Sequence, residues 1–142
     1  MLIQWCLMGG SLALAPLNAG PDLGLFAKIV VILLIVSGSA FGIAGALTMG
    51  RVRTIYPEPA EYARLICHGI YAHVRHPIYT SLILLSFGWS LAWSSVAGFL
   101  IAVVMTLFLM AKSSSEERRL RKRFSEYDAY MKTTKRLIPW IY

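Results

Sequence analysis

Residues 78–111 read IYTSLILLSFGWSLAWSSVAGFLIAVVMTLFLMA, a run of 34 residues without a charged side chain. A single helix of that length would measure about 51 Å, whereas the hydrocarbon core of a bilayer is about 30 Å thick. A single crossing would also put the basic segments on either side of the run on opposite faces, against the positive-inside bias. We therefore expect a hairpin of two short helices that turns near Trp93-Ser94-Ser95 and returns both ends to the cytoplasm.

The composition of the whole chain is that of a membrane protein. Of its 142 residues, 57% are hydrophobic and 15% are charged, against about 45–50% and 25% in soluble domains. The net charge of +7 divides into +2 in residues 50–77 and +5 in residues 112–142, and the remaining segments are neutral. Basic blocks between apolar runs are typical of a polytopic membrane protein. We expect no nucleic-acid partner, because no soluble scaffold carries this charge.

Two apolar runs precede the hairpin. Residues 25–49 are long enough for one span, and residues 2–17 form a shorter candidate. We interpret the shorter run as a retained helix, because no Lys or Arg precedes it as a signal peptide requires. Small residues in the second run would allow another helix to approach closely, either within the chain or in a homodimer; they are Ser37, Gly38, Ser39, Gly42, Gly45 and Ala46.

These features predict an all-α, polytopic membrane bundle of about four transmembrane helices in a single domain, residues 1–142. It would comprise N-terminal spans (1–49), a cytoplasmic loop (50–77) and the hairpin with a cytoplasmic C-terminal helix (78–142). In the tail, Leu120, Phe124 and Tyr127 recur at helical spacing, and this stripe would lie on the membrane or on the loop. Residues 135–142 carry basic and aromatic side chains suited to the membrane interface.

The loop ends in the segment GIYAHVRHPIY, residues 69–79, which is dense in polar and aromatic side chains. Proline keeps His76 out of the α region and suits the first turn of the helix that follows. Unpaired N–H groups at such a helix start can receive an anionic ligand group. The alternative is a membrane anchor, with Arg75 and His76 facing headgroups and Tyr71 and Tyr79 in the aromatic belt.

A second polar cluster, Lys112 to Glu117, lies where the hairpin leaves the apolar run. Acidic residues near the hydrocarbon core are costly unless they are paired, and the hairpin would bring this cluster beside His76. A carboxylate there would face Arg75 or a cationic ligand. The alternative is a surface network with Arg121 and Lys122. We expect no metal site, because the spacing of the three histidines gives no common helical face and Cys67 does not complete a ligand set.

These residues resemble the isoprenylcysteine carboxyl methyltransferase family. The resemblance rests on YAHVRHPIY (71–79), the apolar hairpin, the Glu pair and the later aromatic positions, and it covers about residues 63–140. That family and its relatives, which include phospholipid N-methyltransferases, are integral membrane enzymes that use S-adenosylmethionine. This chain departs from the pattern at Ile70, Ser81 and Ser125, where the family usually has Pro, Gly and Gly. These departures bear on substrate identity more than on family membership.

The resemblance implies a cofactor pocket at the cytoplasmic ends of the last two membrane helices. Backbone contacts of Leu65 and Ile66 would line the adenosine, and Glu116 would pair with the amino group of the cofactor. The rest of the cofactor would be held by Tyr71, His76, Ile78 and Tyr79. Lys112 falls where the family often has an arginine that faces the substrate. Arg75 and Glu117 would brace the pocket, and we include all three among the catalytic candidates.

The implied function is transfer of a methyl group to the carboxylate, or another nucleophile, of a lipidic or hydrophobic acceptor. We expect O-methylation rather than N-methylation, in a multi-pass protein of a prokaryotic cell membrane with its site facing the cytoplasm. Two alternatives remain at this stage: an NADPH-dependent enzyme of the sterol-reductase type, with a phosphate subsite at Arg118 to Arg123, and a non-catalytic protein of the same fold.

Overall fold

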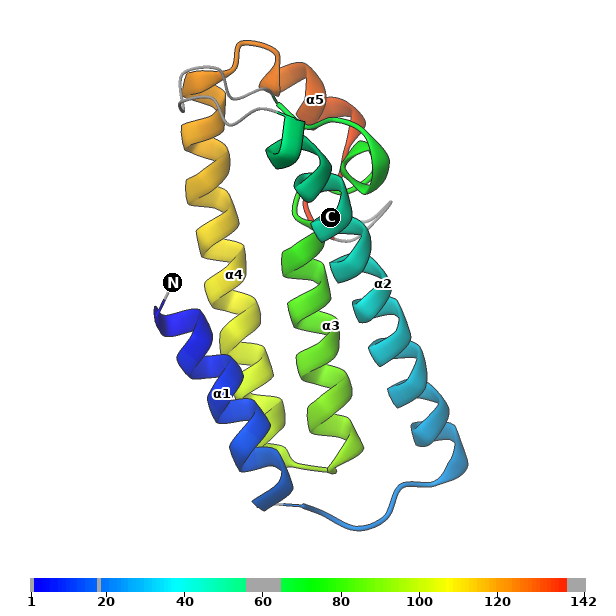
Figure 1. The fold of residues 1–142 in the computed structure, drawn as a ribbon. Coiled ribbons are helices and arrows are strands. Elements are labelled where there is room, and N and C mark those ends of the chain that lie inside the picture. Colours follow the sequence, from blue (N-terminus) through cyan, green and yellow to red (C-terminus); the bar gives the residue numbers. More distant parts are fainter. Residues whose placement is uncertain (1, 18, 56–64, 138–142) are drawn as a thin grey trace.

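Four long helices run side by side along the molecule, and a small cap of irregular chain and short helices covers one end (Figure 1). The computed structural model describes residues 2–17, 19–55 and 65–137. The elements in chain order are α1 (Leu2–Leu17), α2 (Leu25–Ile55), the 3-10 turn η2 (Gly69–Ala72), α3 (Pro77–Ala92), α4 (Val96–Arg123) and α5 (Tyr127–Thr133). The described residues form no named strand, so the all-α prediction is confirmed for them.

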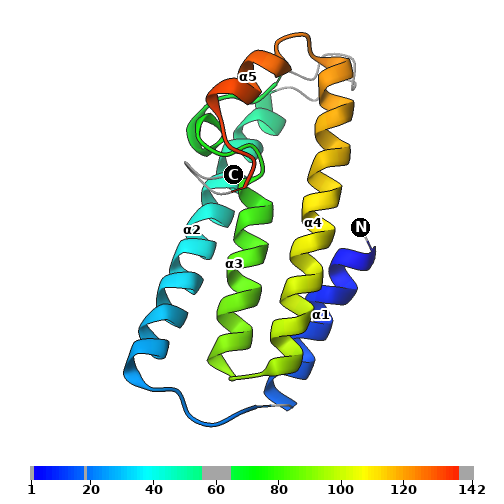
Figure 2. The same cartoon turned by 180° about the vertical axis from the view of Figure 1, so that it is seen from behind.

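The predicted hairpin is present. Helix α3 ends at Ala92, Ser94 adopts a left-handed conformation with φ 48°, and α4 begins after Ser95. The hydroxyl of Ser95 accepts a hydrogen bond from the N–H of Gly98 at 3.1 Å and so caps the new helix. Both outer ends of the hairpin therefore lie at the same end of the bundle (Figures 1 and 2).

The second helix of the hairpin is longer than the sequence pattern suggested. Helix α4 continues without a break from Val96 to Arg123, so about its last three turns extend beyond the uncharged run, which ends at Ala111. It ends at Phe124, whose backbone is extended (φ −119°, ψ 115°). The expectation that Leu120, Phe124 and Tyr127 share one helical stripe was therefore wrong. Phe124 lies between two helices, and Tyr127 opens α5.

Three of the small residues of α2, Gly38, Gly42 and Gly45, pack within the chain against α3. A Cβ placed on Gly42 would lie 2.6 Å from Oγ of Ser81, and one on Gly45 would lie 3.2 Å from Cγ of Pro77. A larger residue at either position would therefore have to displace its neighbour on α3, as is typical of close helix packing in membranes. A homodimer stays a prediction.

Within the described residues, two helices are long and apolar enough to cross a bilayer, over Leu25–Gly50 and Val96–Arg123. Helices α1 and α3 are also apolar but have 16 residues each, or about 24 Å at 1.5 Å per residue. Large apolar side chains remain exposed on the outside of the bundle, such as Phe26 at 80% and Leu107 at 62%. Four complete crossings and the cytoplasmic placement of the C-terminal helix remain predictions.

Candidate active site

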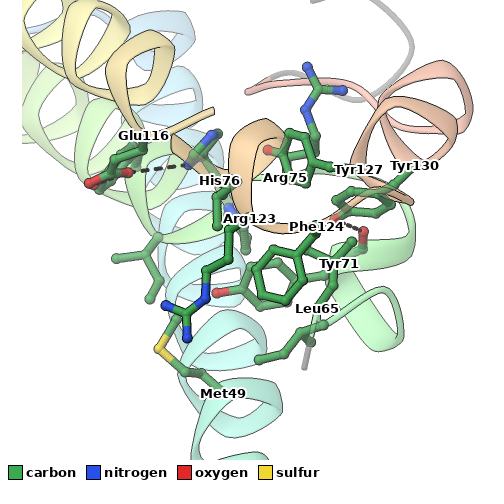
Figure 3. Close-up of a pocket in the computed structure, with 15 residues that line it drawn as sticks. Met49, Leu65, Tyr71, Arg75, His76, Glu116, Arg123, Phe124, Tyr127 and Tyr130 are labelled. Carbon is green, nitrogen blue, oxygen red and sulfur yellow. Dashed lines mark hydrogen bonds and ion pairs between the residues drawn. The ribbon is translucent and has the colours of Figure 1, made fainter. Parts of the chain in front are cut away.

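The hairpin places the His-Pro corner beside the paired glutamates, as expected from the sequence. Nδ1 of His76 lies 3.9 Å from Oε2 of Glu116, and Nε2 lies 3.4 Å from Oε1 of Glu117. Among the described residues, this buried Nε2 has no hydrogen-bond partner. Figure 3 shows the His76 ring directed toward Glu116. Residues 40 positions apart in the chain thus meet at one end of the bundle.

The corner itself is set by Pro77, the first residue of α3. His76 has φ −127° and ψ 60°, outside the α region, as a residue before proline should be. Its carbonyl accepts hydrogen bonds from the N–H groups of Tyr79 and Thr80 at 3.0 and 3.1 Å. Gly45 of α2 lies directly behind Pro77. The close approach of α2 therefore fixes the backbone that carries His76.

Glu116 is held by Tyr79. The phenol hydroxyl of Tyr79 lies 2.8 Å from both carboxylate oxygens of Glu116, to which it donates. The ring of Tyr79 stacks on that of His76, with centroids 5.2 Å apart and an interplanar angle of 5°. The Glu116 side chain is still 30% exposed. Its carboxylate is therefore oriented but able to accept a further hydrogen bond.

Glu117 is buried and surrounded by cations. Its Oε1 accepts from Nε of Arg75 at 2.8 Å, and its Oε2 lies 2.7 Å from Nη2 of Arg136. Nη1 of Arg75 donates to the carbonyl oxygen of Thr134 at 2.5 Å. The surface network with Arg121 and Lys122 is thus not what holds Glu117. The cluster ties α4, the loop and the C-terminal segment together.

The C-terminal segment pairs with the corner through its backbone. The N–H groups of Arg75 and His76 donate to the carbonyl oxygens of Lys135 and Arg136 at 2.8 and 3.1 Å, and the N–H of Lys135 donates to the carbonyl of His73. The sequence had suggested that residues 135–142 anchor the chain at the membrane interface. Residues 135–136 brace the site through this pairing. The interface anchor stays a prediction, and residues 138–142 lie outside the described part of the chain.

A cavity of about 350 Å³ opens in front of Glu116, within the ~300–1,000 Å³ typical of small-molecule sites. In Figure 3, Glu116 lies at one side of the lining, whereas Leu65 and Phe124 lie at the other. Eight of the sequence-predicted site residues line it: Leu65, Ile66, Tyr71, Arg75, His76, Ile78, Tyr79 and Glu116. Lys112 and Glu117, the other two, lie outside the lining. No group of three His, Cys, Asp or Glu side chains in the described chain is placed to hold a metal ion.

The family model described as phospholipid methyltransferase matches residues 26–127, more than two thirds of the sequence. The chain belongs to the phospholipid methyltransferase family. The match spans α2, the corner and the glutamates, which are the elements that build the cavity. No curated protein and no solved structure matches the chain.

The site of this family member includes residues that the sequence alone did not assign to it. The cavity is also lined by Met49, Pro77, Leu120, Arg123, Phe124, Tyr127 and Tyr130. Several of these positions were noted in the sequence. The resemblance includes them, and the spacing of Leu120, Phe124 and Tyr127 predicted one continuous helical face. The break at Phe124 turns them toward the cavity instead. Arg136 carried no recognisable sequence pattern, because its contact depends on the backbone pairing of the C-terminal segment.

The tyrosines of the cap keep their protons at neutral pH. Burial raises the pKa of Tyr127 to about 12, and burial also raises the pKa of Tyr71 and Tyr130. The hydroxyl of Tyr130 donates to the carbonyl of Tyr71 at 2.6 Å. These tyrosines give the cavity an aromatic wall without charge of its own, opposite Glu116.

Lys112 lies one helical turn before Glu116 on α4. Its Nζ is 5.0 Å from the centroid of the Tyr79 ring and donates to Oε1 of Gln4 at 3.0 Å. Gln4 belongs to α1, outside the part of the chain that the family match covers. The lysine is therefore next to the cavity wall, behind Tyr79.

Proposed function

We propose that this chain is an integral membrane methyltransferase that uses S-adenosylmethionine and methylates a carboxylate on a lipidic or hydrophobic acceptor. Membership of the phospholipid methyltransferase family supports methyl transfer. The cofactor assignment depends on the position of the Glu116 carboxylate. This carboxylate is partly exposed and oriented by Tyr79, and among the described residues it is the one acidic side chain in the lining of a largely apolar and aromatic cavity.

The donor set fits such a cofactor. An α-amino group would be held by Glu116, because a charge-assisted hydrogen bond is stronger than a neutral one. The adenosine would lie against the apolar side of the cavity, near Leu65, Ile66 and Phe124. Aromatic faces attract cations, so the tyrosine wall would favour a sulfonium between these two ends. Arg75 and Glu117 act as positioning residues, since their charged groups are bound to each other.

When bound, S-adenosylmethionine would supply an electrophilic methyl group on a sulfonium. An acceptor carboxylate would form the new O–C bond as the S–C bond of the cofactor breaks. The positive charge of the sulfonium and the negative charge of the carboxylate would then disappear together, without release of a proton. No general base is required, because a carboxylate with a pKa of about 4 is ionised at neutral pH. The chain mainly has to align the two partners, and such alignment can supply about 7–11 kcal/mol of the barrier. Lys112 is our candidate for holding the acceptor carboxylate.

An amine acceptor is the second candidate, because the family takes its description from phospholipids. An amine must lose a proton before or during transfer. His76 is the available base at the cavity, whereas Glu117 is enclosed by Arg75 and Arg136. Phosphatidylethanolamine is therefore the appropriate amine probe.

The reductase alternative has little support from the basic cluster. Of the arginines between 118 and 123, Arg121 pairs with Asp128 at 2.6 Å and only Arg123 lines the cavity. NADPH carries several phosphate charges, and the carboxylate of Glu116 would repel them. We also propose that the cavity faces the cytoplasm, because the basic residues gather at that end of the chain's helices.

Calorimetric titration of the detergent-purified protein tests the cofactor. We expect binding of S-adenosylmethionine and S-adenosylhomocysteine but not of NADPH, and we expect Glu116→Ala to abolish binding. Asp22→Asn is the matched control, because Asp22 is 99% exposed near the opposite end of the bundle. Preference for NADPH, or normal binding by Glu116→Ala, would overturn the assignment.

Transfer of a radiolabelled methyl group tests the acceptor. Palmitate serves as a carboxylate probe and phosphatidylethanolamine vesicles as an amine probe. Label in palmitate supports the proposal. Label only in the phospholipid would select the amine reading, and cofactor binding without transfer to either probe would count against both acceptor classes.

A further inference from the structure

The strongest observation that the proposed function leaves unused is the contact between α1 and α4. Gln4 accepts a hydrogen bond from Nζ of Lys112 across 108 positions of sequence. In α1, Gln4 is the one side chain with an amide, and the rest of the helix is apolar or carries small groups. A polar pair between apolar helices needs a reason, because each partner is costly in a membrane when it is alone.

The chemistry of the partner is informative. A glutamate at position 4 would neutralise the lysine, whereas a glutamine holds the amine in place and leaves its positive charge intact. Among the described residues, Lys112 has no ion pair with a carboxylate. The Tyr79 ring, 5.0 Å away, also orients the ammonium without neutralising it. Gln4 and Tyr79 therefore orient the ammonium group of Lys112 between the helices without neutralising it.

The position of this cation relates it to the cavity. Lys112 lies four residues, or about 6 Å of helix rise, below Glu116. Tyr79 separates the two, with its ring toward the lysine and its hydroxyl toward the carboxylate. A carboxylate bound at Lys112 would lie beside the cavity on the side where the helices are apolar. An amphiphile with an anionic head and an apolar tail fits these surroundings.

We propose that Gln4 is a positioning residue that presents Lys112 as an uncompensated cation, so that α1 makes the enzyme selective for acceptors with a carboxylate head group. The proposal rests on the proposed function, which already names a carboxylate acceptor, and it adds the residue and the helix that make the enzyme selective for that acceptor. A purely structural pairing is the competing explanation. It would be preserved or strengthened by a glutamate at position 4.

Gln4→Glu separates the two explanations. The variant supplies Lys112 with a counter-ion, so the protein should unfold at the same temperature or higher, while its preference for an anionic amphiphile should be lost. The assay is fluorescence titration of the full chain in a neutral detergent with palmitate and, separately, with hexadecanol. We expect the wild type to bind palmitate more tightly than hexadecanol. The ratio of the two affinities should fall roughly tenfold in Gln4→Glu, because the new carboxylate would cancel the charge of Lys112 at close range.

Two further variants sharpen the result. Lys112→Gln should lose the preference for palmitate to a similar extent. Adding Gln4→Glu to the Lys112→Gln variant should then cause no further loss. Lys28→Gln is the matched control, because Lys28 lies 3.9 Å from Asp22 near the far end of the bundle and should leave the preference unchanged.

A wild type without a preference for palmitate, or a Gln4→Glu variant that retains it, would overturn the proposal. Titration of the same samples with S-adenosylmethionine keeps this failure distinct from failure of the proposed function. A wild type that does not bind S-adenosylmethionine would count against the proposed function. A wild type that binds S-adenosylmethionine but shows no preference for palmitate would count only against the role of Gln4.

Discussion

At the scale of single residues, two adjacent glutamates have different roles because a helix turns about 100° per residue. Glu116 points toward Tyr79 and the cavity, whereas Glu117 points into the cluster with Arg75 and Arg136. The first is a group that can receive a ligand, and the second is an internal counter-ion. Substitutions at the two positions should therefore affect different properties.

Glu117→Ala should lower stability strongly. Removing one partner from a buried ion pair typically costs about 3–5 kcal/mol, because the remaining charges are left uncompensated. Thermal unfolding in detergent measures this loss, with Glu116→Ala as the comparison. An unfolding temperature for Glu117→Ala equal to that of Glu116→Ala would contradict the internal role.

Tyr79→Phe should weaken S-adenosylmethionine binding while leaving the fold intact. The substitution removes a hydroxyl that donates to Glu116. A hydrogen bond to a charged group contributes about 1.5–3 kcal/mol, so we expect affinity to fall by about tenfold or more. Calorimetry of Tyr79→Phe, Glu116→Gln and the double variant checks the mechanism. If the two effects simply add, Tyr79 does not act through Glu116.

At the scale of elements, the sequence predicted the hairpin well, because an uncharged run too long for one crossing and a polar turn leave few alternatives. It did not predict where α4 ends. Neither Gly nor Pro marks that boundary, and the helix-forming residues 116–123 continue the pattern up to an extended Phe124. Nor did the sequence predict the backbone pairing of the C-terminal segment with residues 73–76, because basic and aromatic composition does not reveal such pairing.

The contact of α2 with the corner gives a prediction at this scale. Gly45→Leu should displace Pro77 and thereby reduce both thermal stability and cofactor affinity, because a Cβ at position 45 already lies 3.1 Å from Ile78 and 3.2 Å from Pro77. Gly9→Leu is the control, since nothing lies within 4 Å of a Cβ there. Equal behaviour of the two variants in unfolding and calorimetry would show that α2 does not support the site.

At the scale of the whole molecule, the bundle has two distinct ends. The corner, the glutamates and α5 gather at one end, and the turn at Ser94 meets the segment before α2 at the other (Figure 2). The N–H of Gly20 donates to the carbonyl of Trp93 at 2.9 Å, and a Cβ on Gly20 would lie 2.6 Å from the carbonyl oxygen of Ser94. Only glycine allows this close approach, which holds the segment before α2 against the turn between α3 and α4.

The difference between the two ends of the bundle predicts its orientation in a membrane, with the cavity end on the cytoplasmic side. In sealed inside-out vesicles of a variant without native cysteines, a membrane-impermeant maleimide should label Ser125→Cys readily and Asp22→Cys only after the vesicles are opened. The expectation follows from the basic residues near the cavity end. Labelling of both positions in sealed vesicles would contradict a bundle that crosses the bilayer.

The most direct measurement is an experimental structure of the protein with S-adenosylhomocysteine bound. We predict that the amino group of the ligand lies within hydrogen-bonding distance of the Glu116 carboxylate and that its adenine lies against Leu65 and Phe124. A ligand at the opposite end of the bundle, in the cavity bordered by Pro21, Lys28 and Trp93, would contradict the account.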